Sequence, residues 1–203
     1  IIEKMMAKKR ENRYESPTEL VNELEPLMAR LKSPKILIIH PANSWIAKDI
    51  ALLIATGAYE QGGKLEIISG EDVKAEYLKE AGAVIIGSVG FDSGLPYDIE
   101  ATLDIMSRFP NDMRGKLGAA FVGYDPRYSQ RNCNYQLQVI MKTMINLEMM
   151  VRGNYEGVLG GQMVLDHESD EAEKCRNIGK DISSMLLYIE AGKQVTERVS
   201  TSG

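Results

Sequence analysis

Asn43 and Ser44 form the first stretch whose side chains could do chemistry. They offer one amide and one hydroxyl directly before an apolar pattern of helical spacing. Such side chains cap the first turn of a helix, and the free N–H groups of that turn also bind phosphate. The two roles can coexist, and the sequence leaves both open. Lys48, in the first turn, either meets a phosphate or is solvated.

Tyr124, Arg127 and Tyr128 form a second candidate group, which follows the apolar run 117–122. The tyrosines could stack on an aromatic ring, and Arg127 could bind an anionic cofactor or substrate. The alternative is a turn built on Asp125 and Pro126 that carries exposed aromatic side chains.

A glycine-bearing loop separates a buried strand from a helix in the middle of the chain. Residues 83–86 are a continuous apolar run typical of a parallel strand, and Gly90, Gly94 and Pro96 follow as loop formers. Helical spacing then begins, with Ile99, Leu103 and Met106 on one face. This βα unit predicts a ligand site, because open α/β sheets bind ligands at the carboxyl ends of their strands.

Other kinds of catalytic site have no support in the sequence. There is no acid–base pair or nucleophile constellation, and His40 and His167 are isolated, which argues against a metal site. Cys133 and Cys175 have no short ligand spacing. We expect two free thiols, one at the start of a helix and one inside a helix.

The composition narrows the class of protein. The 203 residues carry a net charge of -5, which disfavours nucleic-acid binding. No apolar run approaches the roughly 20 residues that span a bilayer. A cytoplasmic location is the default expectation.

Five βα units organise these candidates. Strands are predicted at 35–40, 64–68, 83–86 and 117–122, with a fifth within 155–165, and helices at 45–61, 72–80, 133–150 and 170–189 as well as after Pro96. This alternation predicts a parallel sheet covered on both faces, in one three-layer α/β domain. Residues 1–34 are expected to be an N-terminal helical extension, in which a helix starts at the capping box Ser16-Pro17-Thr18-Glu19. Residues 35–191 are expected to form the domain, and residues 192–203 a flexible tail.

Residues 84–104 resemble the flavodoxin-like superfamily. Gly87-Ser88, Pro96 and Leu103-Asp104 align with its third βα unit without a gap, and residues 115–121 resemble its entry to the fourth strand. The closest resemblance is to the FMN-dependent NAD(P)H:quinone oxidoreductase and flavin reductase branch. It implies a doubly wound five-stranded parallel sheet of order 2-1-3-4-5.

The resemblance also implies FMN held by three loops, with NAD(P)H as co-substrate. Tyr124 and Arg127 would be the catalytic residues beside the flavin. The implied cofactor-binding residues are Pro41, Asn43, Ser44, Trp45 and Ile46 in the first loop, Ser88, Val89, Gly90, Phe91, Asp92 and Gly94 in the second, and Gly123, Tyr124 and Asp125 in the third.

The first loop departs from the family pattern. Phosphate loops of this family are rich in Ser and Thr around a glycine, whereas this loop has one hydroxyl and no glycine. Trp45 could cover a flavin or fill the phosphate cavity. In the second loop, Asp92 either lies near the flavin's N1 edge, where its charge would disfavour the anionic reduced form, or faces solvent in a turn.

Three functions remain open. The first is an FMN-binding oxidoreductase that passes electrons from NAD(P)H to a quinone or similar acceptor. The second is a flavodoxin-type electron carrier, and the third is a flavodoxin-fold binding or assembly module that has lost FMN. The resemblance implies a homo-oligomer, either a dimer or a tetramer. Met141, Met144, Met149 and Met150 either pack in the core or face such a partner.

Overall fold

A parallel β-sheet is the centre of the structure, a computed structural model that describes residues 16, 19, 34–90, 94–124, 130–152, 158–160 and 169–201. The neighbouring strands run in the order β2-β1-β3-β4-β5, and every pair is parallel. The predicted order 2-1-3-4-5 is therefore confirmed. The strands are β1 (Lys35–His40), β2 (Lys64–Ser69), β3 (Ala81–Val89), β4 (Leu117–Tyr124), β5 (Met150–Val151) and β6 (Val158–Gly160).

Two short strands share the fifth position of the sheet. β5 pairs with the start of β4 at Leu117 and Gly118, and β6 pairs with its end, from Val122 to Tyr124. β6 lies inside the predicted range 155–165. β5 was not predicted, because two residues directly after a long helix carry no strand periodicity of their own.

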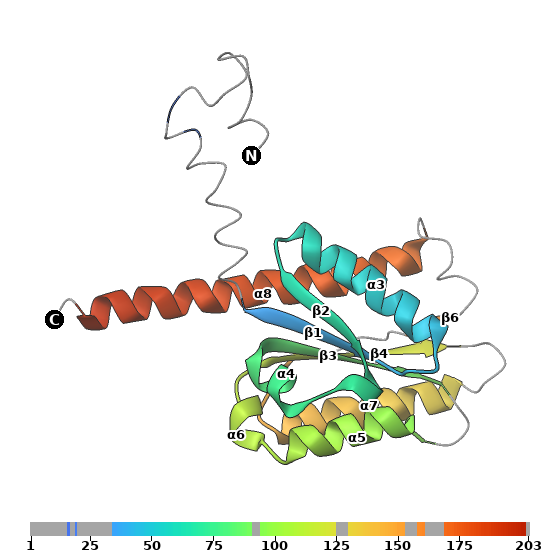
Figure 1. Ribbon diagram of the computed structural model, residues 1–203. Helices are drawn as coiled ribbons and strands as arrows, with labels where there is room; N and C mark the ends of the chain where they lie inside the picture. Colours follow the sequence, from blue (N-terminus) through green and yellow to red (C-terminus); the bar gives the residue numbers. More distant parts are fainter. Residues whose placement is uncertain are drawn as a thin grey trace, which may run out of the picture. The chain divides into compact units, whose positions relative to one another are not determined.

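Helices cover both faces of the sheet (Figure 1). α3 (Trp45–Glu60) and α8 (Asp170–Thr201) lie on one face. The opposite face carries α4 (Ala75–Glu80), α5 (Tyr97–Ser107), α6 (Pro110–Met113) and α7 (Gln130–Asn146). The three-layer arrangement that the sequence predicts is therefore present.

The central strands are apolar on both sides because both sides face helices. In β1, Ile36 and Ile38 pack toward α3 and α8, whereas Leu37 and Ile39 pack into the other cluster. This alternation is the two-residue period of a strand. A strand buried on both faces reads as one continuous apolar run, as the sequence of β1 does.

α3 and α8 approach each other through two glycines. A Cβ atom on Gly57 would lie 1.9 Å from the carbonyl oxygen of Arg176, and one on Gly179 would lie 1.9 Å from that of Ile54. Any side chain at either position would therefore hold the two backbones apart.

Several boundaries differ from the predictions. The helix predicted at 72–80 is a 3-10 turn, η2 (Gly70–Asp72), followed by α4, and α6 was not predicted. α8 continues to Thr201, so most of the segment expected to be a tail is helical.

The methionines near the end of α7 belong mostly to the core. Met144 and Met149 are buried in the cluster beneath α5 and α7, and Met141 packs against it. Met150 is exposed. Core packing therefore explains three of the four, and Met150 is the one available to a partner.

Residues 1–33 are a unit apart from residues 34–203, and the structure describes Ser16 and Glu19 within this unit. In this unit, the backbone N–H of Glu19 donates a hydrogen bond to Ser16 Oγ at 3.2 Å. That bond is the one a capping box requires, so this part of the predicted helix start is confirmed.

Both cysteines are free, as predicted, and both are buried. Cys133 lies in the first turns of α7, and Cys175 lies inside α8 between α3 and the sheet. Burial raises the pKa of both thiols, and it raises that of Cys175 from 9.0 to about 12.

The Cys175 thiol makes stability depend on alkaline pH. Above pH 9 the unfolded chain loses a proton that the folded protein keeps up to about pH 12, so the free energy of unfolding falls over this window. The slope approaches about 1.4 kcal/mol per pH unit. Urea unfolding at pH 8 and pH 10 of the wild type and of Cys175→Ala should show the stability difference between them shrinking by about 1 kcal/mol. Parallel pH dependences would contradict this account.

Among the helices of the described residues, none combines the length and the apolar character that crossing a bilayer requires.

Candidate ligand site at the carboxyl ends of β1, β3 and β4

The chain reverses its winding direction between β1 and β3. From β1 it crosses to β2 through α3 on one face of the sheet, and from β3 it crosses to β4 through α5 on the other. The loops after these two neighbouring strands therefore separate at the sheet edge. This is the topological switch point at which open α/β sheets bind ligands.

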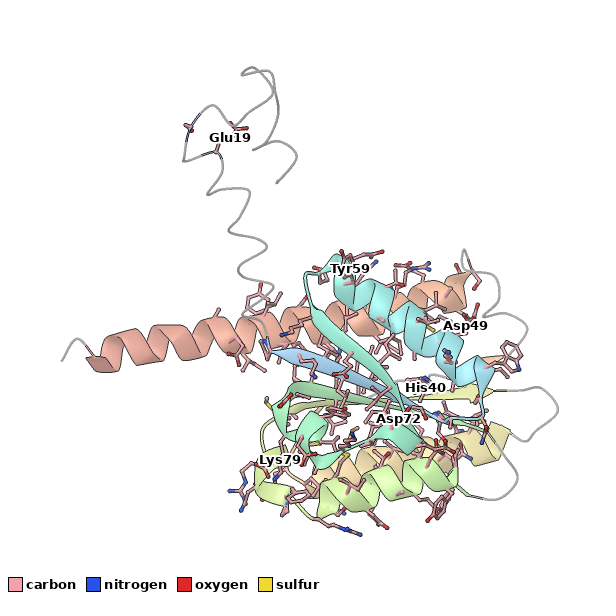
Figure 2. All side chains as sticks on the ribbon, in the orientation of Figure 1. Glu19, His40, Asp49, Tyr59, Asp72 and Lys79 are labelled. Carbon is pink, nitrogen blue, oxygen red and sulfur yellow. The ribbon has the colours of Figure 1, made fainter. Side chains whose placement is uncertain are left out.

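The loop after β1 leads directly into α3. His40 ends the strand, and its Nδ1 lies 2.9 Å from the carbonyl oxygen of Pro41; Figure 2 labels His40 beside the ends of the strands. Ser44 is the N-cap of α3, because its Oγ accepts a hydrogen bond from the backbone N–H of Ala47 at 3.1 Å. The predicted capping role of Ser44 is confirmed, whereas Asn43 is exposed and is not the N-cap.

The first turn of α3 offers anion-binding groups. The backbone N–H groups of Trp45 and Ile46 have no acceptor within the helix, since α3 begins at Trp45. The N–H of Lys48 is the first to donate within the helix, to the carbonyl oxygen of Ser44 at 3.1 Å. Ile46 is buried in the core, but Trp45 is 58% exposed. This end of α3 thus combines unpaired N–H groups with an exposed aromatic ring.

A carboxylate from α5 already binds the start of this loop. The backbone N–H of Ala42 donates to Asp98 Oδ2 at 2.7 Å. A Cβ atom on Gly70, which follows β2, would lie 2.6 Å from the same oxygen. Asp98 therefore lies between the loops after β1 and β2. The sequence did not identify Asp98, because a residue 56 positions from Ala42 gives no local signal.

The loop after β3 is anchored by buried polar groups. Ser88 Oγ donates to Gln136 Oε1 at 3.0 Å, and Gln136 Nε2 donates to the carbonyl oxygen of Gly94 at 2.5 Å. Val89 and Gly90 are also buried. The Ser88 hydroxyl is thus used within the protein.

The end of β4 packs against the beginning of α3. A Cβ atom on Gly123 would lie 2.8 Å from Ile46 Cγ2 and 3.6 Å from the backbone nitrogen of Ala47. Glycine is therefore required here for close approach, not for its backbone freedom. Tyr124 is the last residue of β4. The structure thus brings the first and third predicted loops together at one sheet edge.

Five further predicted residues lie outside the described part of the chain: Phe91, Asp92, Asp125, Arg127 and Tyr128. Their contribution to the site stays a prediction. Lys48 is described and is exposed on α3.

The opposite edge of the sheet has a pocket of about 330 Å³. Its lining is charged, but the cations there have partners: Arg114 pairs with Glu148 at 2.9 Å, and Lys116 Nζ donates to the carbonyl oxygen of Lys79 at 2.7 Å. Lys79, labelled in Figure 2, lies toward the end of the sheet away from His40. Within the described residues, no three metal-ligating side chains gather. The switch point is therefore the stronger candidate.

No family model matches the sequence, and no curated protein matches it. Solved structures do. A flavodoxin from the domain Archaea is 24% identical, with 75% of this chain and 98% of that chain covered and a TM-score of 0.60. A WrbA-like flavodoxin protein from Agrobacterium tumefaciens is 16% identical, with 76% of this chain and 98% of that chain covered and a TM-score of 0.60. The flavodiiron core of Flv1 from Synechocystis is 16% identical, with 86% of this chain and 41% of that chain covered and a TM-score of 0.58. Together with the sheet order, these similarities show that the fold is flavodoxin-like.

Proposed function

We propose that this protein binds FMN at the switch point and transfers electrons. The observation that carries the proposal is the first turn of α3, where two unpaired backbone N–H groups lie beside the exposed ring of Trp45. A phosphate is stabilised by such N–H groups and by the helix dipole. An exposed indole at the same place offers a flat apolar surface for a flavin ring. The flavodoxin and WrbA-like structures of similar fold support this choice of ligand.

The described residues fit FMN in part. Trp45 and Ile46 would hold the phosphate through their backbone N–H groups, and Asn43, an exposed residue directly before the N-cap, would add its side-chain amide. Ser44 keeps these donors in position by capping the helix. FMN, when bound, accepts and donates electrons. The protein's part is to position the flavin and to limit its contact with water, and Trp45 would cover one side of the ring.

Asp98 is the observation that favours a second candidate, a binding module without FMN. Its carboxylate takes the N–H of Ala42, which is the first amide of the loop. A negative charge there opposes the binding of a phosphate dianion, since like charges repel. A ligand without phosphate would avoid this repulsion.

The finer proposal is that electrons pass from NAD(P)H to a quinone or a similar acceptor. The test is a visible absorption spectrum of protein saturated with FMN and then desalted, followed by anaerobic addition of NADPH and then of a quinone. We expect retained flavin bands, bleaching by NADPH and recovery with the quinone. Flavin that is retained but not bleached by NADPH would favour an electron carrier over an NAD(P)H-dependent oxidoreductase. A colourless protein would favour the module without FMN.

Single substitutions of Asn43 and Ser44 should distinguish phosphate binding from helix capping. Ser44→Ala should lower the free energy of unfolding by about 1 kcal/mol, because it removes the N-cap of α3. Asn43→Ala should leave stability unchanged, because Asn43 is exposed and caps nothing, yet it should weaken FMN binding. Flavin fluorescence titrations measure the affinity, and riboflavin, which lacks the phosphate, is the control. Equal weakening of both flavins by Asn43→Ala would exclude a phosphate contact.

A further inference from the structure

Gln136 is a buried polar side chain that joins three elements. It lies on α7 and is 0% exposed, as is Ser88 at the end of β3. Its amide oxygen accepts from Ser88 Oγ, and its amide nitrogen donates to the carbonyl oxygen of Gly94. A buried amide with both ends satisfied holds its partners strongly, because each broken bond leaves a polar group without water.

A second residue of α7 supports the other end of the same loop. Cys133 lies one turn before Gln136, and a Cβ atom on Gly90 would lie 2.4 Å from Cys133 Sγ. The backbone N–H of Gly90 also donates to the carbonyl oxygen of Gly123 at 2.9 Å. Gly90 is therefore held by the beginning of α7 and by the end of β4. Gly94 is held by α7 through Gln136.

We propose that Gln136 is a positioning residue that ties Gly94, and with it the chain between β3 and α5, to α7 and to the end of β3. α7 begins at Gln130, after the third candidate loop, and through Cys133 and Gln136 its first two turns contact Gly90 and Gly94 in the loop after β3. Gly94 has a φ of 70°, a conformation that favours glycine, so the Gln136 bond holds a specific loop geometry.

The consequence for binding rests on the proposed function. A rigid loop has already lost the conformational entropy that a ligand would otherwise have to remove on binding. Loss of the Gln136–Gly94 bond should therefore weaken a ligand held between the two loops. The Ser88–Gln136 bond should matter less for the ligand, because Ser88 is already fixed by strand pairing with β4.

Three variants test this assignment. Gln136→Leu replaces the amide side chain with an apolar one of similar size and removes both hydrogen bonds. Ser88→Ala removes only the bond to Ser88 and keeps the bond to Gly94. Gln138→Leu, an exposed position on the same helix, is the matched control. For each we would measure amide hydrogen exchange of residues 90–96 without ligand, the free energy of unfolding, and the Kd for FMN.

We expect Gln136→Leu to raise the exchange rate in residues 90–96 and the Kd for FMN by about tenfold each, the equivalent of one hydrogen bond. Ser88→Ala should reduce stability but leave exchange in residues 90–96 unchanged, and Gln138→Leu, at an exposed position, should change none of the three measured quantities. Unchanged exchange in Gln136→Leu would overturn the proposal, as would equal effects of Gln136→Leu and Ser88→Ala on exchange. Faster exchange with an unchanged Kd for FMN would contradict the claim that the Gln136 anchor affects ligand binding. If the wild type binds no FMN, the proposed function fails, while the exchange data still decide whether Gln136 anchors the loop.

Discussion

Gly179→Ala should destabilise the protein by about 3 kcal/mol, the upper end of the usual range for overpacking. The added methyl carbon would lie 1.9 Å from the carbonyl oxygen of Ile54 and 2.7 Å from the backbone nitrogen of Ala58. Both neighbours are backbone atoms of α3, so no rotamer change can make room. α8 would have to move away from α3 and take its buried residues with it. Urea denaturation followed by circular dichroism measures the effect.

Gly192→Ala is the matched control on the same helix. Nothing lies within 4 Å of the position of its added carbon, and both residues are inside α8. Alanine is favoured over glycine inside a helix by up to about 1 kcal/mol, so this variant should be neutral or slightly more stable. Similar effects of the two substitutions would contradict the close packing of α3 and α8.

Phe121→Ala should cost about 3–5 kcal/mol of stability. Phe121 is 0% exposed and lies on β4 in the cluster formed with α3 and α8. Its ring lies against Gly87 of β3, where an added Cβ atom would be 2.2 Å from Cζ. Removal of the ring leaves a cavity that the surrounding strands and helices cannot close. Tyr97→Ala, at a side chain that is 86% exposed, should change stability little.

A double-mutant cycle makes the Phe121 prediction more specific. Gly87→Ala alone should be destabilising, because the new methyl group meets the ring. In the Phe121→Ala background the same methyl group enters the cavity, so Gly87→Ala should be much less harmful there or even stabilising. Additive effects of the two substitutions would show that the ring and Gly87 are not in contact.

Local signals predicted the parts of the site that depend on residues close in sequence. Ser44 was identified as a cap because its hydroxyl needs only the N–H of Ala47, three residues later. The strand β1 was predicted at its observed bounds because it is buried on both faces and bounded by Pro34 and Pro41. A ligand site at the carboxyl ends of the strands followed from the βα pattern. The order of the strands came from the resemblance to the flavodoxin-like superfamily.

Long-range polar contacts could not be predicted in this way. Asp98 binds Ala42 across 56 positions, and Gln136 binds Ser88 across 48. The helical period places Gln136 near the buried face of α7, but it does not identify the hydrogen-bond partner of its side chain. A buried glutamine on an apolar face is a signal of an internal hydrogen bond, though not of its partner.

The length of α8 differs from the prediction. The helix was predicted over residues 170–189, with a flexible tail over 192–203, yet α8 continues through Gly192 to Thr201. A glycine within a helix costs only about 1 kcal/mol relative to alanine. The residues after it have no proline, so nothing prevents the helix from continuing.

The most direct test of the account is an FMN titration followed by the fluorescence of Trp45. The chain has one tryptophan, so the signal comes from the first turn of α3 alone. We predict saturable quenching that reaches completion at one FMN per chain, beyond the linear decrease that free N-acetyltryptophanamide shows under the same conditions. Quenching no greater than that of the free compound would mean that FMN does not bind beside Trp45, and it would contradict the proposed site.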